Sequence, residues 1–273
     1  FTVNNTATDY VIGGAAIGGA TGLRKQGSGT LWLKGANTFS GGVTIEGGTV
    51  VESGVKAFKA ALGTGKRGDW ANKLTLKNGV FDLNGTENYR NTNQTGDAYW
   101  GWLSLQTLTL GGQAGTMEIR NGVFGIGTDP AIVYDATNNP GTAIISAAYN
   151  FSGTSGANGA TRQFQIADST ATETEIDFTG GLHVDNWVDG STTTIEKTGA
   201  GTMQLSSPFG FAGLKVTGGT VRMNKAEAFV RGTVTLNGGT LDLNGFNQTL
   251  PVLAGTSGTP VSYTHLTLPT NSL

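Results

Sequence analysis

Short runs of alternating apolar and polar residues dominate the chain. In Leu31–Leu33, Met117–Ile119 and Leu241–Leu243 the two outer residues are apolar, and the middle residue is able to face solvent. Because side chains alternate between the two faces of a strand, such runs predict β-strands of about three to five residues with one buried face. The one candidate helix, residues 55–62, is flanked by glycines and short at best. The pattern predicts an all-β fold.

The predicted strands follow a recurring glycine–threonine figure. Gly-X-Gly-Thr or Gly-Gly-Thr ends at Thr30, Thr49, Thr202, Thr220 and Thr240, and neighbouring threonines within each group are 18 to 20 residues apart. A period of about 20 residues is typical of solenoids. Two or three strands per coil, stacked at ~4.8 Å, predict a parallel β-helix of roughly ten coils and about 50 Å. An antiparallel β-sandwich is the alternative, since short strands with frequent turns also fit it.

The chain also contains a long internal duplication. Residues 27–50 match residues 199–221 at a shift of 171 to 172 positions. We therefore expect one β-helix over residues 1–260, built from two related halves of about 1–163 and 164–260.

The last stretch departs from this pattern. Residues 261–273 have no glycine turn and no matching register, although the repeat leads one to expect another coil there. We interpret them as an unrelated tail, a translated sequencing or cloning scar, and exclude them from the fold prediction. A genuine divergent tail is the alternative.

Composition and charge narrow the class of protein. Glycine contributes 45 of 273 residues, and charged residues 13%. This suits a fold with many tight turns, because glycine adopts positive φ without steric cost. A net charge of −2 provides no basic stripe, so no nucleic-acid partner is expected. The chain has no apolar run long enough for a membrane-spanning helix, and no cysteine for a disulfide or a thiol nucleophile.

The segments around the first glycine–threonine figures resemble a known repeat. They read Leu-Arg-Lys-Gln-Gly-Ser-Gly-Thr-Leu at residues 23–31, Gly-Ala-Asn-Thr-Phe-Ser-Gly-Gly-Val-Thr-Ile at 35–45 and Gly-Gly-Thr-Val at 47–50. This series resembles the passenger-associated transport repeat of autotransporter passenger domains, which Gram-negative bacteria secrete by the type V route. The second copy departs from it at Ser207–Gly210, where the Gly-Ala-Asn-Thr portion is lost. With its flanks, the resemblance covers most of residues 1–250.

The resemblance implies a right-handed β-helix that is exported across the outer membrane and is then exposed at the cell surface or released. The absence of cysteine fits a passenger that crosses the outer membrane unfolded, as the family implies. No C-terminal β-barrel translocator is recognised in this sequence, so we expect no direct membrane insertion of this chain.

Residues that carry catalysis are scarce. The sequence has no Gly-X-Ser-X-Gly motif, and its histidines are His183 and His265, the second in the suspected tail. We therefore expect no catalytic, metal-binding or cofactor-binding residues, and no enzyme. The alternative is a β-helix polysaccharide lyase or hydrolase. Three or more charged side chains on neighbouring coils would favour it, whereas dispersed charges would favour a rod.

Two sets of carboxylates bear on the choice between a polysaccharide-active enzyme and a rod. Asp82 and Asp242 recur in equivalent outward positions, but they belong to different halves and should lie several coils apart. Four further acidic residues lie close together in a threonine-rich stretch, and we expect them to form a solvated surface: Asp168, Glu173, Glu175 and Asp177.

The most specific local signal is a seven-residue insertion in the first half. It contains Arg67, Gly68, Asp69 and Trp70, and insertions in solenoids project as loops that often carry function. The glycine allows a guanidinium and a carboxylate to be presented together, and the tripeptide resembles the integrin-recognition sequence of adhesive proteins. Three residues also arise easily by chance in a glycine-rich chain. We interpret the insertion as a candidate adhesive loop.

A second candidate is the aromatic cluster of Tyr99, Trp100 and Trp102. It would serve as an exposed patch for carbohydrate or protein, although packing of a loop onto the rod is the more ordinary explanation. Together these patterns favour a non-enzymatic surface rod that acts as spacer and adhesin and whose repeats assist secretion. Its expected partner is a host-cell receptor, a matrix protein or a glycan.

Overall fold

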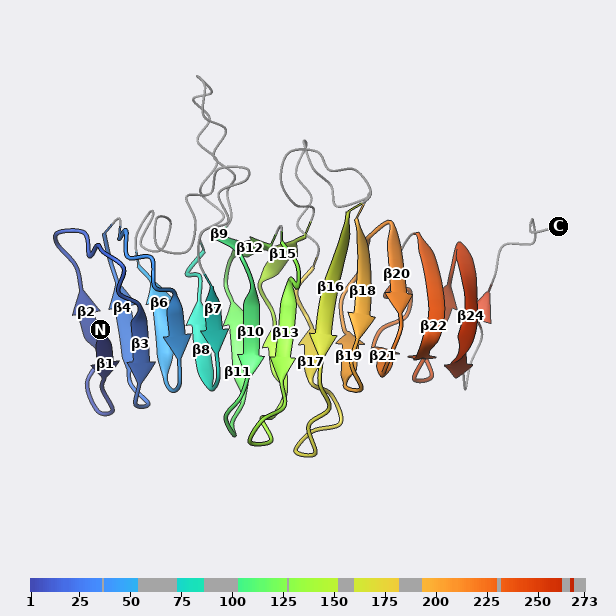
Figure 1. The fold of residues 1–273 in the computed structure, drawn as a ribbon, viewed down its shortest axis with the longest axis horizontal. Helices are drawn as coiled ribbons and strands as arrows, with labels where there is room; N and C mark the ends of the chain where they lie inside the picture. Colours follow the sequence, from blue (N-terminus) through green and yellow to red (C-terminus); the bar gives the residue numbers. More distant parts are fainter. Residues whose placement is uncertain are drawn as a thin grey trace, which may run out of the picture.

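The protein is an elongated parallel β-helix (Figure 1). The computed structural model describes residues 1–35, 37–53, 73–85, 103–126, 128–151, 160–181, 193–229, 232–261 and 266–267. Within these residues all regular elements are β-strands and every strand pair is parallel. The predicted β-helix is confirmed, and the antiparallel sandwich is wrong. The candidate helix at residues 55–62 lies outside the described residues.

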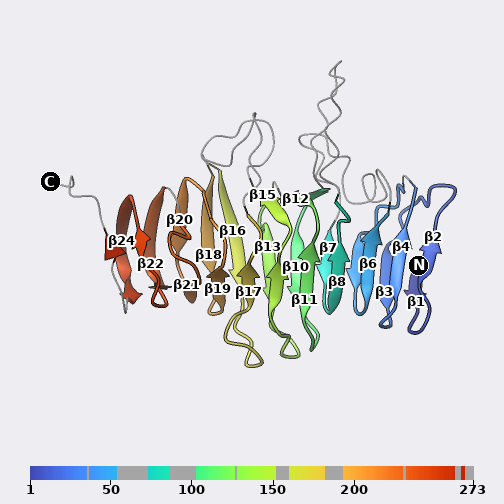
Figure 2. The same ribbon diagram turned by 180° about the vertical axis from the view of Figure 1, so that it is seen from behind.

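Two long faces of stacked strands run along the rod and enclose the core between them. Figure 2 shows the same stack of coils from behind. Face A contains β1 (Thr2–Asn4), β3 (Leu23–Gln26), β5 (Val43–Ile45), β7 (Leu74–Leu76), β10 (Leu108–Gly111), β13 (Ile132–Asp135), β16 (Thr161–Ile166), β18 (Thr194–Thr198) and β20 (Gly213–Val216). Face B contains β2 (Tyr10–Ile12), β4 (Thr30–Leu33), β6 (Thr49–Glu52), β8 (Gly79–Asp82), β11 (Met117–Arg120), β14 (Ala143–Ile145), β17 (Ile176–Phe178), β19 (Thr202–Leu205) and β21 (Thr220–Met223). The long strands β22 (Thr233–Asp242) and β24 (Val252–Val261) continue through both faces.

A third, shorter sheet adds a side to the middle of the rod. It consists of β9 (Leu103–Leu105), β12 (Val123–Ile126) and β15 (Ala148–Asn150), with β12 in the centre. Near the C-terminal end, β23 (Gln248–Thr249) pairs with β25 (Leu266–Thr267). The tail prediction for residues 261–273 stays a prediction, because only Val261 and β25 are described there.

The faces are joined at two corners. The A–B corner is the turn from a face A strand to the face B strand of the same coil, and it forms the lower edge in Figure 1. The B–A corner leads from face B to face A of the next coil, along the opposite edge. The A–B turns are short at residues 27–29, 46–48, 199–201 and 217–219, where glycines occupy positive φ.

The repeating threonines are stacked neighbours on face B. Thr30 lies opposite Thr49, and Thr202, Thr220 and Thr240 follow one another on successive coils. The period read from the sequence is therefore the length of one coil.

The core is a set of apolar columns between the faces. Leu31, Val50, Phe81 and Ile119 stack in one column, and each is at most 1% exposed. Burial of such side chains contributes roughly 1.5 to 3 kcal/mol each, which makes these columns the main source of stability. Where the third sheet widens the interior, aromatic rings fill it, as in the contact of Tyr149 with Phe178 at 5.2 Å between ring centroids. No helix in the described part of the chain is long and apolar enough to cross a membrane.

Candidate functional site

The two stretches predicted to bind partners belong to connections at the same corner of the rod. Arg67, Gly68, Asp69 and Trp70 fall in residues 54–72, between β6 and β7. Tyr99, Trp100 and Trp102 fall in residues 86–102, between β8 and β9. Both stretches lie outside the described residues, so their roles remain predictions. The strand order nevertheless assigns them to the B–A corner of consecutive coils.

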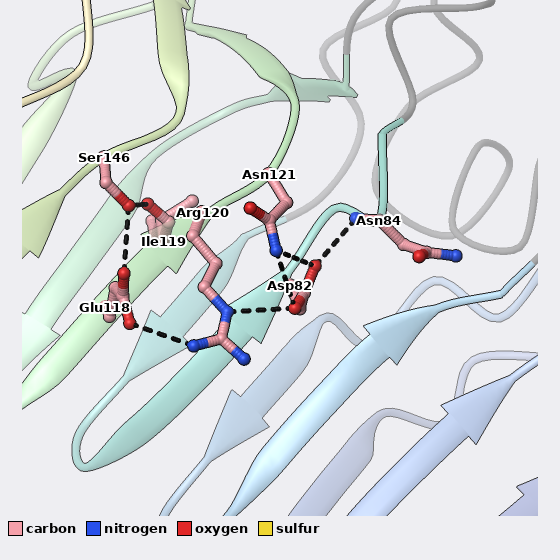
Figure 3. A network of polar contacts seen from close by, with 7 residues as sticks. All are labelled: Asp82, Asn84, Glu118, Ile119, Arg120, Asn121 and Ser146. Carbon is pink, nitrogen blue, oxygen red and sulfur yellow. Dashed lines mark hydrogen bonds and ion pairs between the residues drawn. The ribbon is translucent and has the colours of Figure 1, made fainter.

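The described strand that leads to the second stretch ends in a network of polar contacts (Figure 3). Asp82 accepts a hydrogen bond from the Arg120 Nε at 2.9 Å and from the Asn84 backbone amide at 2.9 Å. The Asn121 side-chain amide lies 3.0 to 3.1 Å from both oxygens of this carboxylate. Asn84 and Asn121 adopt φ of 51° and 58°, a conformation that asparagine tolerates well in turns. Asp82 thus caps its own turn and binds the turn of the next coil.

The same network extends along face B. Arg120 donates to Glu118 at 3.4 Å, and the other oxygen of Glu118 accepts from the Ser146 hydroxyl at 3.0 Å on the following coil. Charged side chains therefore do gather on neighbouring coils, which is the arrangement named above as favouring a polysaccharide-active enzyme. Both carboxylates, however, are bound to an arginine and to further donors, as expected of a bridge between coils.

The equivalent carboxylate in the second half is bound similarly, but its arginine lies on the preceding coil, whereas Arg120 lies on the coil after Asp82. Asp242 accepts from the Asn244 amide at 2.8 Å and from the Arg222 Nε at 3.0 Å. It lies on β22, and Asp82 lies on β8, several coils away.

The acidic stretch at residues 168–177 is only partly the solvated surface expected from the sequence. Asp168 and Glu173 are exposed, but Asp177 is half-buried on β17 and accepts from Gln204 and Ser206. Glu175 is 1% exposed, so the expectation is wrong for this residue. It is buried because its carboxylate accepts the backbone amides of Ser169 and Thr202.

Two buried lysines mark the A–B corner, one in each half. Lys25 is 0% exposed, and its Nζ donates to the carbonyl oxygens of Gln26 at 2.7 Å, Gly27 at 2.9 Å and Gly47 at 3.3 Å. Gln26 ends the lysine's own strand and Gly27 begins the turn that follows it, whereas Gly47 belongs to the turn of the next coil. The ammonium therefore bridges two successive turns.

Lys197 repeats this geometry. It is 0% exposed, and its Nζ lies 3.1 Å from the Thr198 oxygen, 2.7 Å from that of Gly199 and 3.0 Å from that of Gly218. We call each lysine with its three carbonyl oxygens a lysine corner.

Comparison with known proteins identifies these two regions. The family described as passenger-associated-transport-repeat matches residues 23–51 and 195–223. The chain carries two transport repeats. The resemblance to autotransporter passenger domains is thereby confirmed, and each transport repeat contains one lysine corner. No curated protein and no solved structure matches the chain significantly.

Each transport repeat also receives a carboxylate from the preceding coil. Asp9 accepts the Thr30 amide at 2.9 Å in the first repeat, and Glu175 accepts the Thr202 amide in the second. Thr30 and Thr202 are equivalent residues of the Gly-X-Gly-Thr figure. The lysine and the carboxylate thus hold the same turn from opposite sides.

Burial makes the lysine corners unusual electrostatically. Removal of the Lys197 ammonium from water lowers its pKa to about 8, and the nearby Glu175 carboxylate opposes part of this shift. Burial also lowers the pKa of Lys25, with Asp9 opposing it. Sequence reasoning overlooked both lysines, although each precedes Gly-X-Gly-Thr by two residues at the same shift of 172.

The lysine corners have no features of a metal site. No group of three or more histidine, cysteine or acidic side chains suited to a metal ion occurs among the residues that the structure describes. What the transport repeats supply chemically is a set of buried, charge-assisted hydrogen bonds to the backbone.

Proposed function

We propose that this chain is part of an autotransporter passenger, a non-enzymatic rod that acts as a spacer and adhesin at the cell surface or after release. The transport repeats support export across the outer membrane, because that is what their family implies. The observation that carries the proposal is the architecture: a parallel β-helix in which the connections that contain residues 54–72, 86–102, 152–159 and 182–192 all occupy one corner.

The rod accounts for the spacer role and for assistance in secretion. Each coil pairs with the coil before it through parallel strands on both faces, so folding is able to proceed one coil at a time. Coils that stack outside the membrane gain burial and hydrogen bonds that the unfolded chain lacks. This gain disfavours backward movement of the chain.

The B–A corner accounts for adhesion. Four connections contain more than five consecutive residues outside the described part of the chain. All four lie at this corner: 54–72, 86–102, 152–159 and 182–192. The Arg67–Asp69 tripeptide and the Tyr99–Trp102 cluster belong to connections at this corner of consecutive coils, and we propose that both are displayed there for binding. A host-cell receptor, a matrix protein or a glycan is the proposed partner.

Binding measurements on the whole chain test this proposal. The chain is screened against immobilised integrins, matrix proteins and glycans, alongside Asp69→Ala and Trp100→Ala. We expect Asp69→Ala to weaken binding at least about tenfold, because a carboxylate that pairs with a cation or metal in the partner contributes on the order of 2 kcal/mol.

The matched control is Asp168→Ala, which removes an exposed carboxylate at the opposite A–B corner. Binding that is lost with Trp100→Ala, but kept with Asp69→Ala, would move the adhesive role to the aromatic cluster. Absence of binding to every partner class would leave the rod as a spacer and remove the adhesin part of the proposal.

The polysaccharide-active enzyme is not the function we propose. Its strongest support is the group of Asp82, Glu118 and Arg120 on β8 and β11. General acid–base chemistry requires a carboxylate directed at substrate, and both carboxylates here bind donors within the rod.

A further inference from the structure

We propose that the lysine corner of each transport repeat is a register lock, which permits the next coil to stack only in its native alignment. The register lock is distinct from the spacer and adhesin roles proposed above, and it would operate without them. Only its contribution to secretion rests on the proposed function.

The location of the lysines within the core is the first step. Lys25 occupies an inward position between Val3 and Ile45 on neighbouring coils, and Lys197 lies between Phe164 and Val216 in the same way. A buried ammonium costs free energy unless its protons are all paired. Three protons and three carbonyl oxygens satisfy this condition at both corners.

The origin of the three acceptors is the second step. Two of them belong to the lysine's own coil, at the end of its strand and the start of its turn, and are present as soon as that turn forms. The third belongs to Gly47 or Gly218, in the turn of the following coil. The ammonium is therefore fully paired only after the next coil is in place.

The room for the ammonium comes from the same following turn. A Cβ added at Gly48 would lie 2.9 Å from the Lys25 Nζ, and one added at Gly219 would lie 2.6 Å from the Lys197 Nζ. These glycines have φ of 70° and 61°. The next coil thus has to present both a carbonyl oxygen and a glycine at the correct position.

The need for such a lock follows from the strand pattern. A slip of one residue turns every apolar side chain outward, so the alternation itself prevents it. A slip of two residues returns the apolar side chains to the core, so the alternation does not prevent it. It would, however, move the Gly47 or Gly218 oxygen by about 6.6 Å along the strand, out of reach of the lysine.

The carboxylates fix the other side of the turn. Asp9 and Glu175 come from the coil before the lysine and accept the amides of Thr30 and Thr202. Each lock therefore connects three consecutive coils, and equivalent locks occur at both transport repeats.

Hydrogen exchange on the purified whole chain tests the corner itself. Lys197→Met keeps the length and apolar stem but removes the donor. We expect the Gly201 and Thr220 amides, which donate to Ile166 and Gly201, to exchange at least about tenfold faster. The equivalent Gly29 and Thr49 amides in the first half should stay within about twofold.

Cross-linking tests the register, and the cysteine-free chain makes it specific. Glu196 lies opposite Lys215 in the native register, so E196C/K215C reports native stacking. E196C/G213C and E196C/T217C report two-residue slips, because these positions are too far apart to form a disulfide in the native fold. We expect slipped cross-links after refolding to rise at least about fivefold in the Lys197→Met background.

The control is Lys215→Met, which removes an outward lysine that pairs with Glu196 at 2.9 Å, and it should leave exchange at the corner unchanged. Faster exchange without any slipped cross-link would overturn the register lock and leave a simple brace of the turn. Unchanged exchange would overturn both. If Lys197→Met does not fold, Lys25→Met with R24C/T44C and R24C/E46C repeats the test in the first half.

These measurements involve neither secretion nor a binding partner. A negative result would therefore leave the proposed function intact, and a failed binding screen would leave the register lock intact.

Discussion

Glu46 shows how much one side chain holds together on this rod. Its carboxylate accepts from Arg24 at 2.7 Å, Gln26 at 2.9 Å and Lys77 at 3.1 Å, and its backbone oxygen accepts from Gln113 at 3.2 Å. These donors come from the coil before it and from the two coils after it. The Arg24 hydrogen bond is the main reason that the pKa of Glu46 falls to about 2.

Acid should therefore remove the contribution of Glu46 to stability. Because the folded pKa lies below the ordinary value, the charged form stabilises the fold fully above about pH 4.5, and this is lost as pH falls towards 2. Urea unfolding of the wild type and Glu46→Gln between pH 2 and 7 measures the effect. We expect the wild type to be more stable at pH 7 and the difference to vanish near pH 2. An equal difference at both ends would mean that packing, not charge, is responsible.

For single residues, the sequence predicted which side chains point inward, but it did not predict their hydrogen-bond partners. The alternation that places Leu23 inward also places Lys25 inward, but a lysine is usually expected outside. Its acceptors are turn carbonyls from two coils, and no local pattern reveals them. Glu175 was misjudged for the same reason, because the Thr202 amide that it binds is 27 positions away.

The turns are the elements that set the spacing of the stack. At the A–B corner, the backbone of one turn packs directly on that of the next, which leaves no room for a side chain at certain glycines. A Cβ at Gly48 would overlap the carbonyl oxygens of Gly27 and Gly29, whereas one at Gly245 would meet nothing within 4 Å among the described residues.

The pair Gly48 and Gly245 separates crowding from conformational strain. Both have positive φ, 70° and 79°, so alanine is strained at either position, by roughly 1 kcal/mol. Gly48→Ala should lower the free energy of unfolding by about 2 to 3 kcal/mol more than Gly245→Ala, because the overlap forces two coils apart. Thermal unfolding of both variants measures the difference. Equal destabilisation would show that the stacked turns adjust without cost.

Strand positions and turns were predictable because they depend on local pattern. The glycine–threonine figure and the alternation together gave the strands, the parallel stacking and the coil length. No strands were predicted for residues 54–72 and 86–102, because the regular apolar–polar alternation does not continue there. The Asp82 network was missed because Arg120 joins it from another coil.

For the whole molecule, stability should vary along the rod. Strands such as β16 and β18 lie between neighbours on both sides, whereas β24 pairs with β22 on one side and has no second face A neighbour among the described residues. Most of β24 from Val252 to Thr259 is exposed. An unpaired strand edge of this kind opens easily and invites pairing with other chains.

Hydrogen exchange along the native rod tests this gradient. We expect amides of β24 to exchange at least about a hundredfold faster than those of β16 and β18, because local opening of the last strand exposes little apolar surface. Equal protection of β24 and the middle strands would contradict the gradient and would point to self-association through that edge. Repeating the measurement at two protein concentrations distinguishes self-association from intrinsic stability.

The stacking of coils also determines how the rod responds to a pull along its length. Hydrogen bonds between coils run along the axis, so the junctions between coils are loaded in series. Every junction bears the full force, and the weakest junction breaks first. The two lysine corners, with carboxylate ties on one side and carbonyl ties on the other, reinforce junctions near Lys25 and Lys197. Failure under tension would therefore begin between them or beyond them, and each reinforced group of three coils would remain folded as a point from which the rod reassembles.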